Sequence, residues 1–234
     1  MKDHNFFHHP SLYGQCFFKS ILFDSLSTED IKLIDSVKSE KIFKKGQIVC
    51  NEGDEIHEFY HLKHGLVKIY TSDRSGREHI VSIAKPFDFI GFFTSFSESH
   101  YQYSIAAIED SCFCIFDLEA IKNLIKTNSK FAYSLIENMS KVSDHIIRTK
   151  IELDSKMLKG RIAYIILYFA EFVYKNHIFE FPLSRKEIAD LISMTTENVI
   201  RTLSEFRKDH IIEIEGKQIK IINMEMLNKI KNAG

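Results

Sequence analysis

One pentapeptide of the chain has the spacing of a catalytic zinc site. His57-Glu58-Phe59-Tyr60-His61 matches the HExxH pattern, in which a metallopeptidase uses the two histidines to bind zinc and the glutamate as general base. That chemistry needs a helix, which brings positions i and i+4 to one face. Here the pentapeptide lies between Gly53 and Gly65, in a stretch that predicts short strands. On a strand the two histidines would be roughly 13 Å apart, so the sequence favours ordinary strand histidines over a zinc peptidase.

The remaining cysteines and histidines do not define a metal or cofactor site. Cys112 and Cys114 are separated by one residue on a predicted strand, and two cysteines alone are not a zinc or iron–sulfur framework. We expect both to be core residues. The 11 histidines include none whose spacing selects it as a haem ligand, so we predict no cofactor, and nothing supports haem or a small apolar effector directly.

A group of four side chains has the chemistry of base recognition. They share the face of a predicted helix opposite Val199, Leu203 and Phe206, and they are Thr196, Glu197, Ile200 and Arg201. An arginine can bind guanine O6 and N7 bidentately, and a glutamate can accept a hydrogen bond from cytosine N4. On an isolated helix, Glu197 and Arg201 would instead form a solvent-exposed ion pair. The neighbouring elements decide between these interpretations.

The elements around this helix have the pattern of a winged helix-turn-helix. Ser184-Arg185-Lys186-Glu187 is a capping box that begins a first short helix. That helix ends over Ile192-Ser193-Met194, and a second begins after Thr195 as N-cap. The runs Ile211–Ile214 and Gln218–Ile222 then predict a hairpin wing. Helix starts and wing tips are where phosphates are usually held, so we expect phosphate contacts from Ser184, Arg185, Thr195 and Lys217.

Upstream of this unit, apolar residues follow a heptad spacing along one long helix. The residues of this predicted seam are Leu135, Met139, Val142, Ile146, Thr149 and Leu153. A narrow stripe on a helix of about 30 residues more often pairs with a second copy than with its own domain, although packing within the chain stays open. The seam therefore predicts a parallel homodimer.

The first half of the chain has a different sequence pattern, typical of short strands. Short runs rich in Ile, Val, Phe and Tyr extend from about Lys41 to Asp117 and are separated by glycines, which predicts an antiparallel barrel or roll. Ser72 to Gly76 is a hairpin signal within it.

The composition excludes several classes of protein. The chain has 234 residues, of which 44% are hydrophobic and 27% charged, as in ordinary globular proteins. Its longest apolar run, Ile162 to Ala170, is too short to cross a bilayer. The N-terminus has no secretory pattern, and the four cysteines are scattered, so we expect a cytoplasmic protein. Residues 155–234 carry 13 Lys and Arg against 10 Asp and Glu, a weak indication of an anionic partner.

The order of these elements resembles the Crp/Fnr family of bacterial transcription factors, which includes the cyclic-AMP receptor protein and the fumarate–nitrate regulators. The matching motifs are Gly53 and Gly65 flanking a strand, Asp88-Phe89-Ile90-Gly91, Gly160-Arg161-Ile162-Ala163 and Thr196-Glu197-Asn198-Val199-Ile200-Arg201. The resemblance covers nearly the whole chain and implies an α+β protein. It implies an N-terminal antiparallel β-roll of the cyclic-nucleotide-binding type, a double-stranded β-helix, over residues 1–125. A long dimerisation helix over 126–157 and a winged helix-turn-helix over 158–234 follow.

The resemblance also assigns the base readers. In the family a glutamate and an arginine four residues later read bases, and Glu197 and Arg201 occupy these positions. Thr196 replaces an arginine of the cyclic-AMP receptor, and Ile200 replaces a serine of the fumarate–nitrate regulators. The resemblance therefore does not give the operator sequence.

The predicted effector pocket is where the chain departs from the cyclic-AMP receptor. The resemblance places it at Phe92, Phe93, Gln102, Tyr103, Ile146 and Ile147. The phosphate-pairing arginine of that receptor is Gln102 here, and no Lys or Arg occurs from Pro86 to Ala120. A buried cyclic phosphate without a cation is costly, so we expect an effector other than cyclic AMP. The aromatic residues would either line an apolar pocket or fill it as core. The cysteine cluster of the oxygen-sensing branch is represented by Cys16 alone.

These observations predict a homodimeric transcription regulator rather than an enzyme. Its partners would be double-stranded DNA with a palindromic operator and RNA polymerase. The alternative is a ligand-binding module that uses its winged domain for protein contacts. Salt separates the two, because DNA binding through several phosphates weakens steeply with salt.

Overall fold

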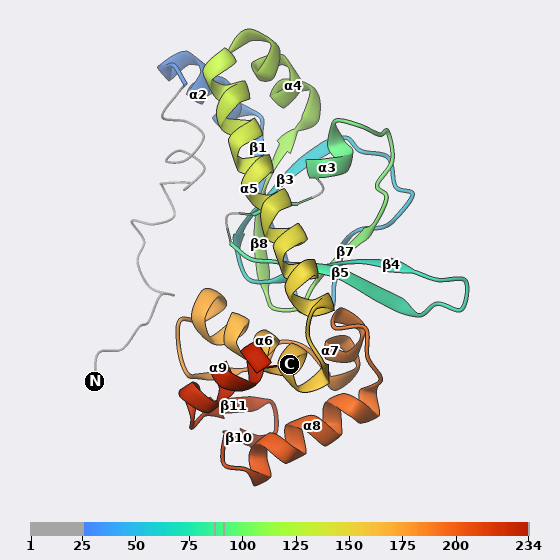
Figure 1. Ribbon diagram of the computed structural model, residues 1–234. Helices are drawn as coiled ribbons and strands as arrows, with labels where there is room; N and C mark the ends of the chain where they lie inside the picture. The colour runs from blue at the N-terminus through green and yellow to red at the C-terminus, as the bar shows by residue number, and fades with distance from the viewer. Residues whose placement is uncertain (1–25, 87, 91, 234) are drawn as a thin grey trace.

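The computed structural model describes residues 26–86, 88–90 and 92–233, so the predictions that involve Cys16 and Gly91 lie outside the described residues. Figure 1 shows a β-rich N-terminal part, one long helix along its side and a C-terminal helical part at the end of that helix. This is the α+β architecture predicted from the sequence. No helix in the described part of the chain is long and apolar enough to span a membrane.

The N-terminal part is an antiparallel roll of two four-stranded sheets. One sheet has the order β1-β8-β3-β6, from Lys38–Phe43, Ser111–Asp117, Glu58–His64 and Phe89–Ile90; the other has the order β2-β7-β4-β5, from Ile48–Cys50, Ser104–Ala107, Val67–Ser72 and Glu78–Ala84. Helix α2 (Thr28–Ser36) precedes the roll, and helix α3 (Phe92–Ser95) follows β6. Aromatic and branched side chains fill the space between the sheets, with Phe59, Leu62 and Phe113 fully buried. The predicted hairpin joins β4 and β5.

Gly65 illustrates why glycines punctuate the roll. Its backbone has a φ of +87°, and a Cβ added there would lie only 2.5 Å from the carbonyl oxygen of Asp110. The chain turns from β3 into β4 at this point. Only glycine fits, because it has neither the Cβ nor the steric barrier to positive φ.

Two helices lead out of the roll. Asp117 caps α4 (Leu118–Thr127), and Asn128 caps α5 (Ser129–Asp154) by accepting from the backbone N–H of Phe131. The long helix predicted from the heptad spacing is therefore α5, and it begins where Asn128 interrupts the preceding helix. It runs along the roll toward the C-terminal part (Figure 1).

The predicted seam of α5 faces its own chain, and here the sequence interpretation needs correction. Leu135 and Leu153 are only 3% and 6% exposed, Leu135 in the roll core and Leu153 in the C-terminal core. Met139 packs against the roll core, Val142 and Ile146 line a cavity beside β5, and Thr149 lines a second cavity next to α6. Leu135 and Leu153 are not available to a second helix, so for these two residues the seam prediction is wrong. For these two residues the heptad spacing reflects packing within the chain, and the other four residues of the seam stay a prediction.

A different face of α5 carries exposed apolar side chains. Ile136, Ile147 and Ile151 are 58%, 56% and 62% exposed, and Tyr133 is exposed as well. Ile147 and Ile151 follow Ile136 by 11 and 15 residues, about three and four turns of helix, so the three side chains share one face. We call Tyr133, Ile136, Ile147 and Ile151 the outer stripe of α5.

The C-terminal part, which we call the winged domain, runs from α6 to α9. Its elements are α6 (Leu158–Tyr168) with a π-helical continuation η2 (Phe169–Val173), β9 (Ile178–Glu180), α7 (Arg185–Leu191), α8 (Thr196–Lys208), β10 (Ile212–Glu215), β11 (Gln218–Ile221) and α9 (Met224–Ala233). The three strands form one antiparallel sheet in the order β10-β11-β9. Its β10-β11 hairpin is the predicted wing.

Part of the roll is buried in the hydrophobic core of the winged domain. Side chains of the roll, among them Tyr70, Ile80 and Ile83, belong to the same buried cluster as α6, α7 and α8. Two ion pairs tie α7 to the β4-β5 hairpin: Lys68 Nζ lies 3.0 Å from Glu187 Oε1, and Arg77 Nη2 lies 3.1 Å from Asp190 Oδ1. The position of α7 is therefore set by the roll as well as by its own domain.

Candidate nucleic-acid interface and effector cavity

The helix-turn-helix is built as the sequence indicates. Ser184 caps α7 by accepting from the backbone N–H of Glu187, whose side chain accepts from the Ser184 N–H in return. Thr195 caps α8 in the same way, accepting from the N–H of Asn198 at 3.3 Å. Between the helices, Ser193 adopts a φ of 55°, a left-handed conformation that glycine takes at lower cost. The turn is thus closed by local hydrogen bonds and a strained serine.

Helix α8 buries one face and exposes the other. Val199, Thr202, Leu203 and Phe206 are buried against the winged domain. On the opposite side Glu197, Ile200 and Arg201 are exposed, and Thr196 is half-buried. Figure 1 places α8 at the outer edge of the molecule. The structure therefore brings the four predicted base readers together on a free helix face.

The charged groups of this face are oriented by neighbours on α8. Arg201 Nη2 donates to Asn198 Oδ1 at 3.0 Å, and its Nε lies 4.0 Å from Glu205 Oε1. Glu205 in turn pairs with Lys159 of α6 at 2.8 Å. Backbone and Thr195 hydrogen bonds lower the pKa of Glu197, and this exposed carboxylate is an acceptor for a base N–H. Asn198, which orients Arg201, was not among the predicted site residues.

The predicted phosphate contacts lie at the starts of α7 and α8 and at the wing turn. Ser184 and Thr195 are exposed at the starts of the two helices, and Lys217 is exposed at the wing turn beside Gly216. Arg185 is half-buried, and desolvation lowers its pKa. The first three side chains are exposed to solvent, although Ser184 and Thr195 also hold helix caps, whereas Arg185 reaches solvent only in part.

The HExxH pentapeptide is not on a helix. His57 directly precedes strand β3, where its Nε2 lies 3.0 Å from Glu55 Oε2, and His61 is buried within β3 opposite Cys114. Within the described residues, no group of three or more His, Cys, Asp and Glu side chains is placed to hold a metal ion. Cys114 is buried in the roll core as expected, whereas Cys112 on the same strand β8 is only half-buried and is not a core residue.

Burial of His61 predicts a pH-dependent stability. Burial lowers its pKa to about 4, whereas in the unfolded chain an unperturbed histidine titrates near ~6.5. Between these values only the unfolded chain binds the extra proton, so the contribution is complete above ~6.5 and is lost as the pH falls toward the folded-state pKa. We expect the free energy of unfolding to fall by about 2 kcal/mol from pH 7 to pH 5 through this group. Urea unfolding of the wild type and of His61→Leu at pH 7 and pH 5 measures this loss of stability. The other titratable groups contribute equally in the two proteins, so the difference between them belongs to His61. An identical pH dependence in the two proteins would contradict this assignment.

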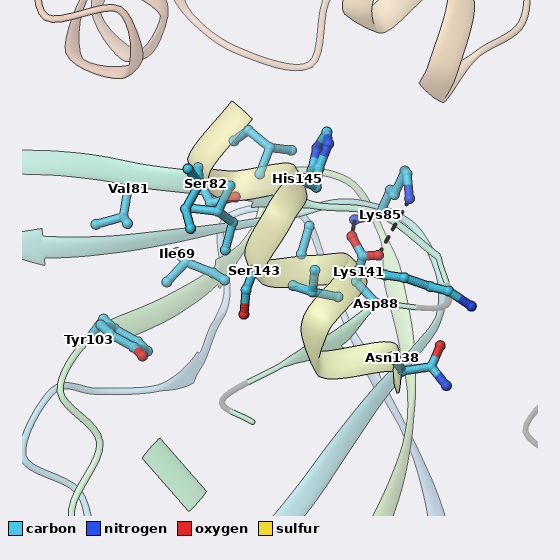
Figure 2. Close-up of a pocket in the computed structure, with 15 residues that line it drawn as sticks. Ile69, Val81, Ser82, Lys85, Asp88, Tyr103, Asn138, Lys141, Ser143 and His145 are labelled. Atoms are coloured by element: carbon cyan, nitrogen blue, oxygen red, sulfur yellow. Dashed lines mark hydrogen bonds and ion pairs between the residues drawn. The ribbon is translucent and has the colours of Figure 1, made fainter. Parts of the chain in front are cut away.

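A cavity of about 470 Å³ lies between the roll and α5 (Figure 2). Strand β5 and the segment after it form one wall, and α5 forms the other with Asn138, Lys141, Val142, Ile146 and Ile147. Tyr103 closes a further side. Three of the predicted pocket residues, Tyr103, Ile146 and Ile147, thus line one cavity. Gln102 does not line the cavity: its side chain is exposed, and its Nε2 donates to the carbonyl oxygen of His100. The side chains of Phe92 and Phe93 lie outside the described residues.

The charges of this cavity are already paired. Lys85 Nζ lies 3.4 Å from Asp88 Oδ1, which Figure 2 shows within the cavity lining, and Lys141 Nζ lies 2.6 Å from Glu137 Oε1. No other lysine or arginine lines the cavity in the described part of the chain. An anionic group entering here would compete with these carboxylates for its cations.

The β-roll, the capped helix-turn-helix and the exposed face of α8 together define the architecture of a DNA-binding regulator. Comparison with known proteins agrees with this. The family model of the "Cyclic nucleotide-binding domain" matches residues 40–128, and the model of the "Crp-like helix-turn-helix domain" matches residues 160–230. The chain belongs to the Crp/Fnr family of transcription regulators, a family of non-enzymatic proteins.

The similarity to known proteins covers most of the chain. The Regulatory protein HlyX of Actinobacillus pleuropneumoniae is 26% identical over 209 residues, which cover 87% of this chain and 86% of the relative. The Fumarate and nitrate reduction regulatory protein of Vibrio cholerae is 25% identical, covering 85% and 81%. Among solved structures, FixK2 from Bradyrhizobium japonicum superposes with a TM-score of 0.74 at 22% identity, covering 83% of this chain and 97% of that one.

Proposed function

We propose that this DNA-binding regulator acts as a homodimer on a palindromic operator, with one α8 helix in the major groove of each half-site. The observation that carries the proposal is the exposed face of α8, on which Glu197 and Arg201 lie side by side while the opposite face is buried. Thr196 and Ile200 complete the set of base-contacting residues. Ser184, Arg185, Thr195 and Lys217 would hold the flanking phosphates. A two-fold dimer would read half-sites roughly 34 Å apart.

The outer stripe of α5 supports the homodimer. Four large apolar side chains on one helix face are exposed in the single chain, and a second copy of α5 would bury them against its own stripe. The inner face of the same helix is committed to the roll and the winged domain. We therefore propose that α5 serves both as an internal strut and as the dimer helix.

The cavity beside α5 is the proposed effector site. Its lining includes helix residues Ile146 and Ile147 on one side and Tyr103 of the roll on the other. A ligand bound there would contact the helix whose outer face meets the partner, and so bias the relative position of the two winged domains. The paired lysines and the carboxylate of Asp88 support an effector other than cyclic AMP.

We assign the parts of the chain accordingly. Residues 1–125 would form the sensory part, 126–157 the dimer helix, and 158–234 the DNA-binding part. RNA polymerase is a further proposed partner, because a transcription regulator acts by changing polymerase recruitment or progress.

Selection of binding sites from random duplex DNA with the purified full-length protein tests this function. We expect a palindromic motif whose binding weakens steeply as salt rises, because each phosphate contact releases counterions. Added cyclic AMP should leave the affinity for that motif unchanged at fixed salt. If neither the protein alone nor the protein with cell extract enriches a motif, the assignment of Glu197 and Arg201 as base readers is wrong.

A further inference from the structure

The recognition face of α8 contains one large apolar side chain. Ile200 is 50% exposed, adjacent to Arg201 and one helical turn after Glu197. The apolar residues that hold α8 in the fold, such as Val199 and Leu203, are buried on the other side of the helix. Ile200 is therefore not part of the core that stabilises the winged domain.

The polar groups next to Ile200 determine which part of the DNA its side chain would contact. Arg201 is oriented by its hydrogen bond to Asn198 Oδ1 at 3.0 Å, and the N-terminus of α8 is fixed by the Thr195 cap. Because Ile200 shares the exposed face of α8 with Glu197 and Arg201, base contacts by those two residues would place its branched side chain against the same groove floor. It would lose contact with water there.

Only one base offers an apolar group that an isoleucine side chain can contact in the major groove. Guanine, adenine and cytosine present hydrogen-bonding groups at their groove edges, whereas thymine presents a C5-methyl group. A polar base edge covered by isoleucine would lose water without gaining a partner, while a methyl group would gain apolar contact. We propose that Ile200 reads a thymine methyl group in each half-site, next to the base pairs contacted by Glu197 and Arg201. This inference rests on the proposed function.

Deoxyuridine tests the contact, because it differs from thymidine only in lacking the methyl group. Each thymine of one half-site of the selected operator is replaced in turn, and the affinity of the full-length protein is measured at fixed salt. We expect one position at which the replacement weakens binding about fourfold, the fold-change that corresponds to burial of about one methyl group.

The variant Ile200→Ala identifies the side chain responsible. Because Ile200 is exposed and alanine favours helix, this variant should fold normally. We expect it to bind thymine and deoxyuridine equally at the sensitive position, whereas Ile42→Ala, which changes an exposed isoleucine on β1 of the roll, keeps the fourfold difference. The inference is overturned if Ile200→Ala retains the difference or if no thymine is sensitive. Failure to select any operator would instead refute the proposed function itself.

Discussion

Arg201→Ala should cost about 1–3 kcal/mol of discrimination between the operator and random DNA. The guanidinium is exposed on the outer face of α8, where its Nη2 donates to Asn198 Oδ1 at 3.0 Å, and its remaining N–H groups can donate two parallel hydrogen bonds to guanine. Alanine removes both donors and leaves the acceptors of that base without a partner. Affinities for the selected operator and for a random duplex of the same length, measured at one salt concentration, give the discrimination directly.

Lys217→Ala is the matched control for this experiment. Both variants remove one exposed positive charge from the winged domain, but Lys217 lies at the wing turn, where we expect a phosphate contact. Its loss should weaken binding to all sequences similarly and reduce the salt dependence by about one counterion. An equal loss on operator and random DNA for Arg201→Ala would remove this arginine from the base readers.

Ile151→Glu should convert the protein from dimer to monomer. Ile151 is 62% exposed on the outer stripe of α5, and at a two-fold interface the substitution would place a carboxylate from each copy in apolar surroundings. Each buried, unpaired charge costs several kcal/mol, more than one isoleucine contributes. Sedimentation equilibrium measures the dimer dissociation constant, and operator affinity should fall with it because a monomer reads one half-site.

Ile42→Glu separates this effect from a general response to surface charge. It makes the same substitution at an isoleucine that is 65% exposed on β1 of the roll, and we expect it to remain dimeric. A dimeric Ile151→Glu protein would show that the outer stripe is not the interface between copies. The proposal that α5 is the dimer helix would then have to be abandoned.

The elements that local sequence signals define were predictable. The capping box at Ser184, the cap at Thr195 and the hairpin turn between β4 and β5 depend on residues within a few positions of one another, and the structure has each of them. The orientation of α5 was not predictable in the same way. A heptad shows that one helix face is buried, but the surface that buries it is decided by residues distant in sequence.

The same distinction applies to the sites. The face of α8 follows from helical period alone, so Glu197, Ile200 and Arg201 could be grouped from their spacing. The cavity is made by β5, Tyr103 and α5, which meet only in the folded chain. The resemblance brought Tyr103, Ile146 and Ile147 to one site, but nothing in the sequence showed that Gln102 turns to solvent or that Lys85 and Asp88 pair within the lining.

The interior shared by the roll and the winged domain limits how such a protein can be recombined. Because Tyr70, Ile80 and Ile83 of the roll are buried with α6, α7 and α8, cutting the chain after α5 would expose apolar surface on both fragments. The charges of Glu187 and Asp190 would lose their partners at the same cut. A hybrid regulator that joins this winged domain to a foreign sensor would also have to keep the β4-β5 hairpin of this chain. The functional module is therefore discontinuous in sequence.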